Sequence, residues 1–125
     1  VELPTNREPI LVCIMHLSLG KRARRLQMAY ISELVKEYSQ LIVMGDFNCG
    51  IDSEELQDLV DNTHLILPVE DLKTFPSWRP NRKYDHILIS DSLELERTHV
   101  LEHTHSDHLP ICVEVKLPSG VYLES

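Results

Sequence analysis

Asp46 and Asn48 stand two positions apart in the stretch LIVMGDFNCG (residues 41–50), directly after an apolar run. A buried strand that ends there needs only a turn, and Asp and Asn form such turns by bonding their own backbone. The same side chains also offer a carboxylate and a carboxamide, which suit divalent cations and phosphate oxygens. For this pair alone, both interpretations, a turn and a phosphate or metal site, stay open.

Polar side chains also lie at or near the ends of other apolar runs, at His16, Asp85, Asp107 and His108. Taken singly, each is more simply explained as a strand-end or loop residue whose polar group is satisfied by the backbone. If the strands pack together, however, these groups would meet the first pair at one rim. Aspartate oxygens are hard ligands suited to Mg²⁺, and a histidine beside a carboxylate can stay protonated and donate to a phosphate oxygen.

The other histidines and the cysteines are interpreted as structural. The histidines that we assign to the surface or the structural framework are His64, His86, His99, His103 and His105. Two of them, His103 and His105, flank a threonine and could form an opportunistic metal site. Cys13, Cys49 and Cys112 are widely spaced and include no CxxC pair, which indicates free thiols in a reducing compartment and argues against a zinc site.

Hydrophobic patterning places the candidate side chains on strands. Apolar runs predict a strand within residues 9–20 that ends at His16, and a second strand with its exit loop at 41–48. Side chains in residues 84–90 and 109–117 alternate between the two faces of a predicted strand, and in the second run one of these faces is polar and exposed to solvent. Each candidate group therefore sits on or beside a predicted strand.

Two segments have helical periodicity. In residues 21–40 the apolar face is predicted to comprise Leu26, Ala29, Tyr30, Leu34, Val35 and Tyr38. Residues 52–62 predict a short helix, with Asp52 as N-cap and Glu55 completing a capping box. The proline-containing segment 65–83 is predicted to be irregular. This order predicts a mixed α+β or α/β sandwich, with helices covering at least one sheet face.

Composition limits the class of protein. A chain of 125 residues with 42% hydrophobic residues allows one domain with an ordinary core. The net charge of −8 argues against a protein that binds nucleic acid non-specifically, because such proteins have an excess of basic residues. A bound divalent cation would, however, change the local field. The chain starts at Val1, which suggests processing or a longer parent. No membrane span or signal pattern is visible, so the cytoplasm is the expected location.

Four stretches occur in an order that resembles one known superfamily: MHLSLGKRARRLQ, LIVMGDFNCG, RKYDHILIS and THSDHLPICVEV. Together they are similar to the endonuclease/exonuclease/phosphatase superfamily, which includes pancreatic-type deoxyribonucleases, abasic-site endonucleases, inositol-polyphosphate phosphatases and neutral sphingomyelinases. The resemblance runs from about residue 10 to residue 116, and GDFN and SDH are its sharpest motifs. It implies an α+β fold: a β-sandwich with flanking helices, in four layers α/β/β/α.

The resemblance implies a role for each residue around the nucleophile and the metal. Asp46 would orient or deprotonate the attacking water and, in some members, touch the metal. Asn48 would hydrogen-bond the scissile phosphate and help to place the nucleophile. Asp107 would lie beside the metal, directly or through water. The implied cofactor is Mg²⁺ or Mn²⁺.

The histidines would carry the electrostatics of the same site. By resemblance, His108 contacts a non-bridging phosphate oxygen and stabilises the charge of the transition state. Asp85 holds His108 by a hydrogen bond and favours its protonated form. His16 matches a position where members place a His or Tyr facing the phosphate. Family members also have an arginine and a glutamine in the first helix, which Arg25 and Gln27 match. The basic run that contains Arg25 is otherwise more simply a solvated face.

One large departure concerns the N-terminal half of the family domain, which supplies the glutamate that is the principal metal ligand. Only nine residues precede Ile10, and Glu2 and Glu8 have the wrong surroundings for that role. Residues 1–125 are therefore expected to be a single partial domain, the C-terminal part, with about one sheet and its helices. Such a half would expose apolar surface, be poorly active alone, and need either the missing N-terminal half or a homodimer.

The leading hypothesis is a Mg²⁺-dependent phosphoesterase. Its phosphate-ester substrate could be nucleic acid, an inositol phosphate or a phospholipid headgroup. In this family the loops between the shared strands largely determine the substrate, so the shared motifs do not distinguish among these. The competing hypothesis is a non-catalytic interaction or assembly module that retains the fold. The two differ in geometry: the enzyme requires the candidate side chains to converge, whereas the module would tolerate their dispersion.

Overall fold

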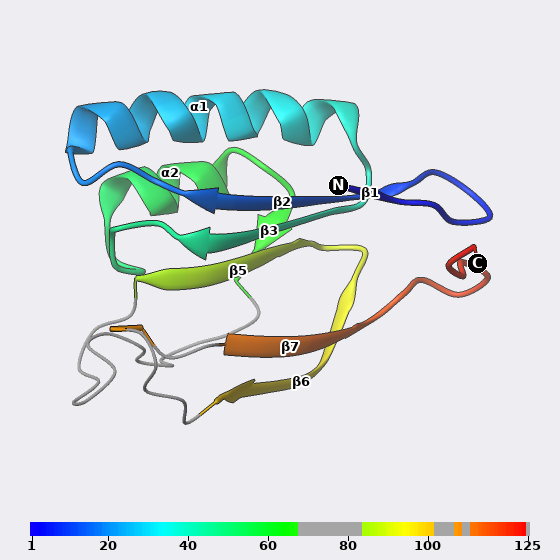
Figure 1. The fold of residues 1–125 in the computed structure, drawn as a ribbon. Coiled ribbons are helices and arrows are strands. Elements are labelled where there is room, and N and C mark those ends of the chain that lie inside the picture. Colours follow the sequence, from blue (N-terminus) through cyan, green and yellow to red (C-terminus); the bar gives the residue numbers. More distant parts are fainter. Residues whose placement is uncertain (68–83, 102–106, 109–110, 125) are drawn as a thin grey trace.

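A computed structural model of the chain describes residues 1–67, 84–101, 107–108 and 111–124 (Figure 1). Its main sheet has five strands in the order β1-β2-β3-β5-β4. These strands are β1 (Glu2–Leu3), β2 (Ile10–His16), β3 (Leu41–Asp46), β5 (Asp85–Ser90) and β4 (Leu65–Ile66). A second sheet pairs β6 (Glu94–Val100) with β7 (Ile111–Lys116) in antiparallel fashion.

Two helices and the second sheet lie on opposite sides of the main sheet. Helix α1 (Lys21–Glu37) and helix α2 (Glu54–Asp61) cover one face, and the β6-β7 sheet lies on the other side (Figure 1). The described residues thus form helix, sheet and sheet layers, which confirms the predicted α+β sandwich with helices on a sheet face. Neither helix has the length and apolar character that a membrane span needs.

The connection between β2 and β3 explains where polar side chains gather. These strands pair in parallel, with α1 as the crossover between them, because parallel neighbours need a connection long enough to return to the same end. Strand β5 then pairs with β3 in antiparallel fashion. The C-terminal ends of β2 and β3 and the N-terminal end of β5 therefore share one rim of the sheet.

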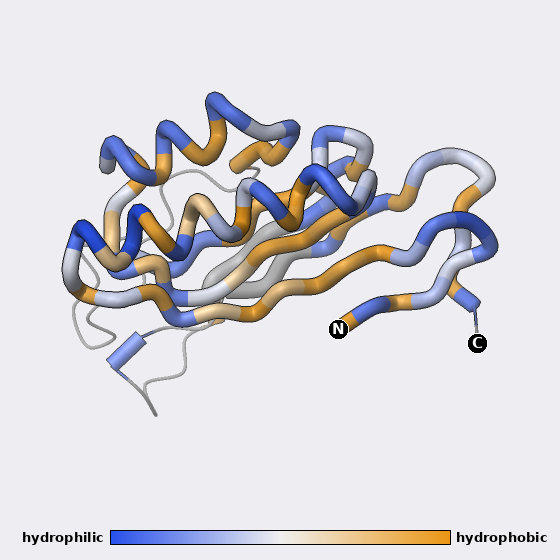
Figure 2. Tube along the Cα trace, turned by 90° about the horizontal axis from the view of Figure 1, so that it is seen from above, coloured by the Kyte–Doolittle hydropathy of each residue, from blue (hydrophilic) through white to orange (hydrophobic). Residues whose placement is uncertain are grey.

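In the part of the chain that the structure describes, the buried apolar residues form two clusters separated by the main sheet. Residues from alternate positions of β3 divide between them: Leu41 and Val43 join the helix-side cluster, whereas Ile42 and Met44 pack with Ile87, Ile89 and Leu93 on the side of the second sheet. In Figure 2 the strands are largely hydrophobic along their length, while α1 alternates between hydrophilic and hydrophobic positions. This is the pattern of a sheet that is packed on both faces.

The predicted face of α1 is only partly correct. Met28, Ile31 and Val35 are buried against the sheet, whereas Leu26 and Tyr30 have relative exposures of 69% and 67%. Of the buried residues only Val35 belongs to the predicted face. The side of α1 that packs on the sheet therefore lies along one edge of a wider apolar surface of the helix. The rest of that surface borders strand β2, where Ile14 is 75% exposed. The expectation of exposed apolar residues therefore agrees with the structure.

The N-terminus of α2 differs from the predicted capping box. The N-cap is Ser53, whose hydroxyl accepts a hydrogen bond from the Leu56 N–H at 3.3 Å, so Asp52 is not the cap. The helix begins at Glu54, which puts Glu55 in its second position. A capping box needs the acidic residue in the third position, and the carboxylate of Glu55 instead contacts Arg24 on α1.

Candidate active site

Side chains from neighbouring strands form a row across the shared rim of the main sheet. In the strand register His16 is paired with Asp46, and Asp46 is paired with Asp85. The parallel β2–β3 pair and the antiparallel β3–β5 pair bring these residues together from positions far apart in the chain. The rim thus gathers an imidazole and two carboxylates.

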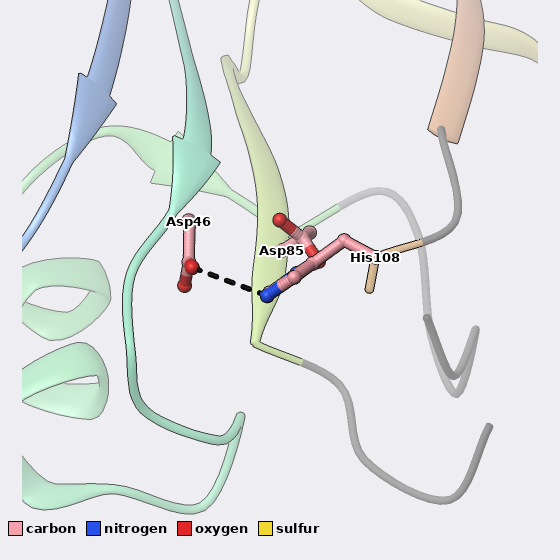
Figure 3. Close-up of side chains that lie close together, drawn as sticks. All are labelled: Asp46, Asp85 and His108. Carbon is pink, nitrogen blue, oxygen red and sulfur yellow. Dashed lines mark hydrogen bonds and ion pairs between the residues drawn. The ribbon is translucent and has the colours of Figure 1, made fainter. Parts of the chain in front are cut away.

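His108 reaches this row from the segment that precedes β7 (Figure 3). Its Nδ1 atom lies 2.6 Å from Oδ2 of Asp85, and its Nε2 atom lies 3.5 Å from Oδ2 of Asp46. All three side chains are partly buried, with relative exposures of 24% for His108, 20% for Asp85 and 17% for Asp46. The imidazole therefore stands between two carboxylates and faces one with each nitrogen.

The charge state of His108 follows from this environment. Partial burial alone would lower its pKa, because it disfavours the charged form. The hydrogen bond to Asp85 and the negative charges of Asp85, Asp46 and Asp107 outweigh burial, and the net effect is a raised pKa. The imidazolium form is favoured, and in that form both ring nitrogens are donors.

Asp46 uses its two oxygens differently. Oδ1 accepts a hydrogen bond from the backbone N–H of Asn48 at 2.8 Å, which is the Asx-type turn that the sequence allowed. Oδ2 lies 3.5 Å from His108 Nε2 and 3.6 Å from His16 Nε2. The turn interpretation is thus correct for one oxygen, and the turn holds the carboxylate so that the other oxygen faces the imidazoles.

Asn48 is held in an uncommon backbone conformation. Its φ angle is 51°, in the left-handed region that asparagine tolerates better than most residues. Its side-chain Nδ2 donates to the backbone carbonyl of Leu17, at 2.5 Å, in the loop that follows β2. The carboxamide is therefore tied to the loop that follows β2.

His16 and Asp107 are placed less tightly than the central cluster. The side chain of His16 is 76% exposed, and its 3.6 Å separation from Asp46 is longer than a hydrogen bond. Asp107 is also exposed, and its charge contributes to the raised pKa of His108, its neighbour in the chain. Both residues lie where a bound ligand or ion would be accessible to solvent.

Gly45 is a site residue to which the sequence analysis gave no role. Its φ angle is 141°, and a Cβ atom placed on it would lie 1.8 Å from the backbone oxygen of Met15 on β2. Only glycine adopts this backbone at so close an approach. The GD pair in GDFN therefore has a steric cause, because the glycine lets β3 reach the rim beside β2 just before Asp46.

The donor atoms fit a loosely held divalent cation better than a closed metal cage. Donor atoms of Asp46, Asp85 and His108 lie within 4.8 Å of one another. Asp85 and His108, however, are hydrogen-bonded to each other, and Mg²⁺ prefers oxygen ligands. The carboxylate of Asp46, together with that of Asp107, which precedes His108 in the chain, then offers the candidate ligands for the ion. One or two carboxylates, completed by water and phosphate oxygens, are typical of Mg²⁺.

Two other histidines have structural contacts. The ring of His86 is buried, its Nε2 lies 2.8 Å from the Cys49 carbonyl oxygen, and it packs edge-on against Phe47. His64 Nε2 lies 3.2 Å from the Ser90 hydroxyl. These contacts agree with the structural interpretation. The side chains of His99 and Cys112, the opportunistic pair His103 and His105, and most of segment 65–83 lie outside the described residues.

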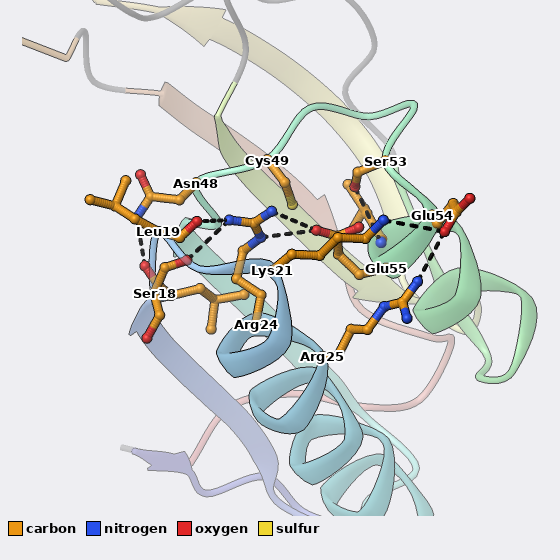
Figure 4. Close-up of polar contacts among 12 residues, drawn as sticks. Ser18, Leu19, Lys21, Arg24, Arg25, Asn48, Cys49, Ser53, Glu54 and Glu55 are labelled. Carbon is orange, nitrogen blue, oxygen red and sulfur yellow. Dashed lines mark hydrogen bonds and ion pairs between the residues drawn. The ribbon is translucent and has the colours of Figure 1, made fainter.

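The basic start of α1 is divided between the interior and solvent (Figure 4). Arg25, which the resemblance matched to a family arginine, pairs with Glu54, whose side chain is 72% exposed. Arg24 instead turns inward to Glu55, whose side chain is 3% exposed. The arginine that turns inward is thus the neighbour of the one that the resemblance matched, and no charge pattern in the sequence distinguishes the two.

Comparison with known proteins finds a matching family model and solved structures with a similar fold. Residues 9–108 match the family model described as Endonuclease/Exonuclease/phosphatase family. The fold is similar to a mannosyl-6-phosphatase of Bacteroides thetaiotaomicron VPI-5482, with 24% identity and a TM-score of 0.78 over 87% of this chain and 52% of that one. A family protein from Bacteroides thetaiotaomicron gives 26% identity and a TM-score of 0.76, over 86% of this chain and 49% of that one.

A more distant similarity involves a protein that was solved with DNA. A 3′ phosphatase from Neisseria bound to a product DNA hairpin shares 20% identity and a TM-score of 0.61, over 77% of this chain and 52% of that one. The chain thus spans about half the length of these solved structures. A comparison with curated proteins finds no match.

Proposed function

Because the chain belongs to the Endonuclease/Exonuclease/phosphatase family, we propose that it carries the C-terminal part of a metal-dependent active site that hydrolyses phosphate esters. The observation that carries the proposal is the position of His108 between Asp85 and Asp46, at 2.6 Å and 3.5 Å. The partly buried imidazolium of His108 is a cationic hydrogen-bond donor, and the carboxylate of Asp46 beside it is a proton acceptor. Attack of water on a phosphate requires both kinds of group within one small region.

Asp46 is the proposed general base. Its Oδ1 is occupied by the Asn48 backbone N–H, so Oδ2 is the oxygen that accepts the proton of the attacking water. As that proton leaves, the new P–O bond forms and the ester oxygen departs with the bonding electron pair. The turn that holds Oδ1 keeps Oδ2 at the rim and limits its motion, which favours a defined direction of attack.

His108 is the proposed electrostatic stabiliser. Asp85 accepts the Nδ1–H at 2.6 Å, which fixes the ring plane and leaves the Nε2–H directed to the side of the site where Asp46 lies. With the pKa of His108 raised, Nε2 keeps its proton, and this N–H is the proposed charged donor to a non-bridging phosphate oxygen. Charge-assisted donors of this kind matter most where negative charge grows in the transition state.

Asn48 and His16 complete the proposed phosphate contacts. Asn48 has a second side-chain N–H besides the one it donates to Leu17, and His16 presents an exposed imidazole beside Asp46. A bound Mg²⁺ or Mn²⁺ would supply charge neutralisation at the phosphate, with Asp46 and Asp107 as its candidate ligands. The carboxylate oxygens of Asp46 and Asp85, which lie close together at the rim, support metal chemistry in a general sense.

The extent of the domain is a second part of the proposal. Because the chain covers about half of its structural neighbours, residues 1–125 are proposed to be one partial domain whose site is completed by an N-terminal half or by a second copy. The substrate is proposed to be a phosphate ester of a nucleic acid, an inositol phosphate, a phospholipid headgroup or a related sugar phosphate. The neighbours described as acting on a mannosyl phosphate and on a DNA 3′ phosphate support this general class.

The interaction-module hypothesis is less well supported than the enzyme. It would tolerate dispersed side chains, whereas the register places His16, Asp46 and Asp85 side by side and His108 joins them. The geometry therefore favours catalysis.

The direct test is hydrolysis of bis-p-nitrophenyl phosphate and p-nitrophenyl phosphate with Mg²⁺ or Mn²⁺, against EDTA. Asp46→Ala and His108→Ala should abolish metal-dependent turnover, and Asp91→Ala serves as control, because Asp91 is exposed beyond the opposite end of β5. If the chain alone is inactive, the assay is repeated after adding an N-terminal half from a family member. Turnover that persists in both site variants, or that never appears with the added half, would overturn the proposal.

A further inference from the structure

The ion pair between Arg24 of α1 and Glu55 of α2 is buried, whereas the other ion pairs between these two helices in the described residues are exposed. Nη2 and Nε of Arg24 donate to Oε1 of Glu55 at 2.7 Å and 3.0 Å. The side chains of Arg24 and Glu55 are 12% and 3% exposed. Lys21 and Arg25, on the same helix as Arg24, instead pair with Glu54, whose side chain is 72% exposed (Figure 4). The chain thus offers a buried pair and an exposed counterpart between the same two helices.

The other edge of the Arg24 guanidinium reaches the loop between β2 and α1. Its Nη1 donates to the Ser18 carbonyl at 3.3 Å and to the Leu19 carbonyl. The N–H of Ser18 donates in turn to Oε1 of Gln27 at 2.9 Å. Side chains of α1 therefore clamp this loop through its backbone groups, while Glu55 holds the guanidinium from behind.

The clamped loop is also the one that holds Asn48. The carbonyl of Leu17 accepts from Asn48 Nδ2 at 2.5 Å, and the N–H of Leu17 donates to the Asp46 carbonyl at 2.8 Å. Arg24 bonds Glu55 and the carbonyls of Ser18 and Leu19, and Asn48 bonds the carbonyl of the adjacent Leu17, so the ion pair is linked to the Asn48 carboxamide through the loop backbone. Because a carboxamide is planar, a fixed partner for one N–H sets the direction of the other N–H and of the oxygen.

We propose that Arg24 and Glu55 are positioning residues that orient the Asn48 carboxamide towards the scissile phosphate through the loop at Leu17–Leu19. The inference rests on the proposed function, because Asn48 needs a defined direction only if it contacts a phosphate. Arginine suits this task because its planar fork carries donors on two edges, one for the carboxylate and one for the carbonyls. Lysine has one nitrogen and reaches fewer of these partners.

Stability alone explains this arrangement less well. A buried ion pair can often be replaced by packed apolar side chains at little or no cost in stability. The contacts of Nη1 with two loop carbonyls add nothing to the bond between the helices, but they fix the segment that bears the partner of Asn48. A positioning role accounts for both edges of the guanidinium, whereas a helix-to-helix bond accounts for one.

The test measures the Asn48 carboxamide directly by ¹⁵N NMR of the full chain. The signals are assigned with Asn48→Asp, and Asn62 and Asn6 give internal references, because their Nδ2 atoms donate to the Asp58 and Gly120 carbonyls. The double variant Arg24→Met with Glu55→Leu removes the clamp but keeps an apolar contact. We expect the Asn48 NH₂ signals to shift and to exchange faster with water, while those of the references stay in place.

The matched control is Lys21→Met with Glu54→Leu, which removes an exposed pair between the same helices and should leave the Asn48 signals unchanged. Circular dichroism and thermal unfolding verify that each variant is folded. Unchanged Asn48 signals in a folded clamp variant would overturn the proposal. If the double variant does not fold, Arg24→Lys decides the matter: a shift of the Asn48 signals supports the clamp, and their constancy refutes it.

Hydrolysis assays distinguish a failure of the positioning role of Arg24 and Glu55 from a failure of the proposed phosphoesterase function. Where the chain or its complemented form turns over bis-p-nitrophenyl phosphate, the clamp variant should lose kcat with little change in KM, because a misdirected Asn48 weakens transition-state contacts more than binding. A clamp variant with shifted Asn48 signals and unchanged kcat would overturn the role in positioning. Absence of turnover in the complemented wild type would refute the proposed function, while the NMR result would still decide whether the clamp orients Asn48.

Discussion

Nδ1 of His108 lies 2.6 Å from Oδ2 of Asp85, although 23 positions separate the two residues in the chain. The contact joins the start of β5 to the segment that precedes β7, and so connects the main sheet to the second sheet at the rim. It also determines the chemistry of the imidazole, because the carboxylate fixes the ring and favours its protonated form. The same bond therefore has a structural and an electrostatic consequence, and the two can be measured separately.

Asp85→Asn should lower the pKa of His108. In the wild type that pKa is raised because Asp85 and neighbouring negative charges outweigh the effect of burial, and the amide removes both the charge and the charge-assisted acceptor. The measurement is an NMR titration of the His108 ring protons in the metal-free chain, with His64, which contacts Ser90, as internal reference. An unchanged His108 pKa in the variant would mean that Asp85 does not stabilise the protonated form of His108.

The same substitution has a pH-dependent effect on stability. A histidine whose folded pKa is raised contributes stability that is fully present below its unfolded pKa of about 6.5 and is lost as the pH rises through the folded pKa. The free energy of unfolding of the wild type should therefore exceed that of Asp85→Asn most at pH values near 5.5. The difference should shrink above the folded pKa. Urea unfolding at several pH values measures it, and a difference that grows with pH would contradict the assignment.

Glu55→Gln should destabilise the chain by about 3 kcal/mol at neutral pH, since it leaves Arg24 buried beside a neutral partner. Burial alone would raise the pKa of Glu55, but the hydrogen bond from its own backbone N–H and the pairing with Arg24 outweigh it and lower the pKa. The stabilisation is therefore present above the unfolded pKa of about 4.3 and is lost as the pH falls through the folded pKa.

Urea unfolding of wild type and Glu55→Gln at neutral and acidic pH measures this effect. The matched control is Glu54→Gln, which alters an exposed partner of Lys21 and Arg25 and should change stability by no more than about 0.5 kcal/mol. Equal effects of the two substitutions would show that burial of the Arg24–Glu55 pair has no energetic consequence.

Much of the fold and of the rim followed from the sequence. Apolar runs predicted the strands that carry His16, Asp46 and Asp85, and the order of strands and helices predicted a sandwich with helices on a sheet face. The resemblance of YDHILIS and SDH to known motifs then implied that Asp85 would bond His108, and the structure has that contact. The catalytic roles of these residues stay predictions, because proximity alone does not demonstrate chemistry.

Other features could not be read from the pattern, for identifiable physical reasons. Strand β6 was missed because Glu94, Glu96 and Arg97 give it the composition of a solvated loop. The burial of Arg24 was missed because Lys21–Arg25 is uniformly basic in composition, and only packing against α2 selects one side chain for the interior. Partners from distant segments decide both cases, and a local pattern contains no information about them.

Gly45→Ala should destabilise the fold by about 3 kcal/mol or more, because the backbone at φ 141° is unfavourable for any residue with a Cβ. The added methyl would also meet the Met15 backbone oxygen, so β2 and β3 would have to separate. The matched control is Gly20→Ala, which has no atom within 4 Å of the added Cβ and should cost less than about 1 kcal/mol. Thermal and urea unfolding measure both, and a Gly45→Ala chain as stable as Gly20→Ala would contradict the close approach.

The pH profile of hydrolysis should report the His108–Asp85 pair. If the protonated His108 donates to a phosphate oxygen, activity falls at high pH as that proton is lost. Asp85→Asn should move this alkaline limb to lower pH, because it lowers the pKa of His108, and should reduce the maximal rate by roughly tenfold or more. His108→Gln should remove the limb altogether.

The profile is measured on the active form, either the chain itself or the chain complemented by an N-terminal half, with saturating Mg²⁺ so that metal binding does not shape the limb. Asp91→Asn is the control for a lost surface charge, since Asp91 is exposed past the far end of β5, and its profile should overlay that of the wild type. An alkaline limb that stays in place in Asp85→Asn would show that another group titrates there, and His108 would then lose its role as the charged donor.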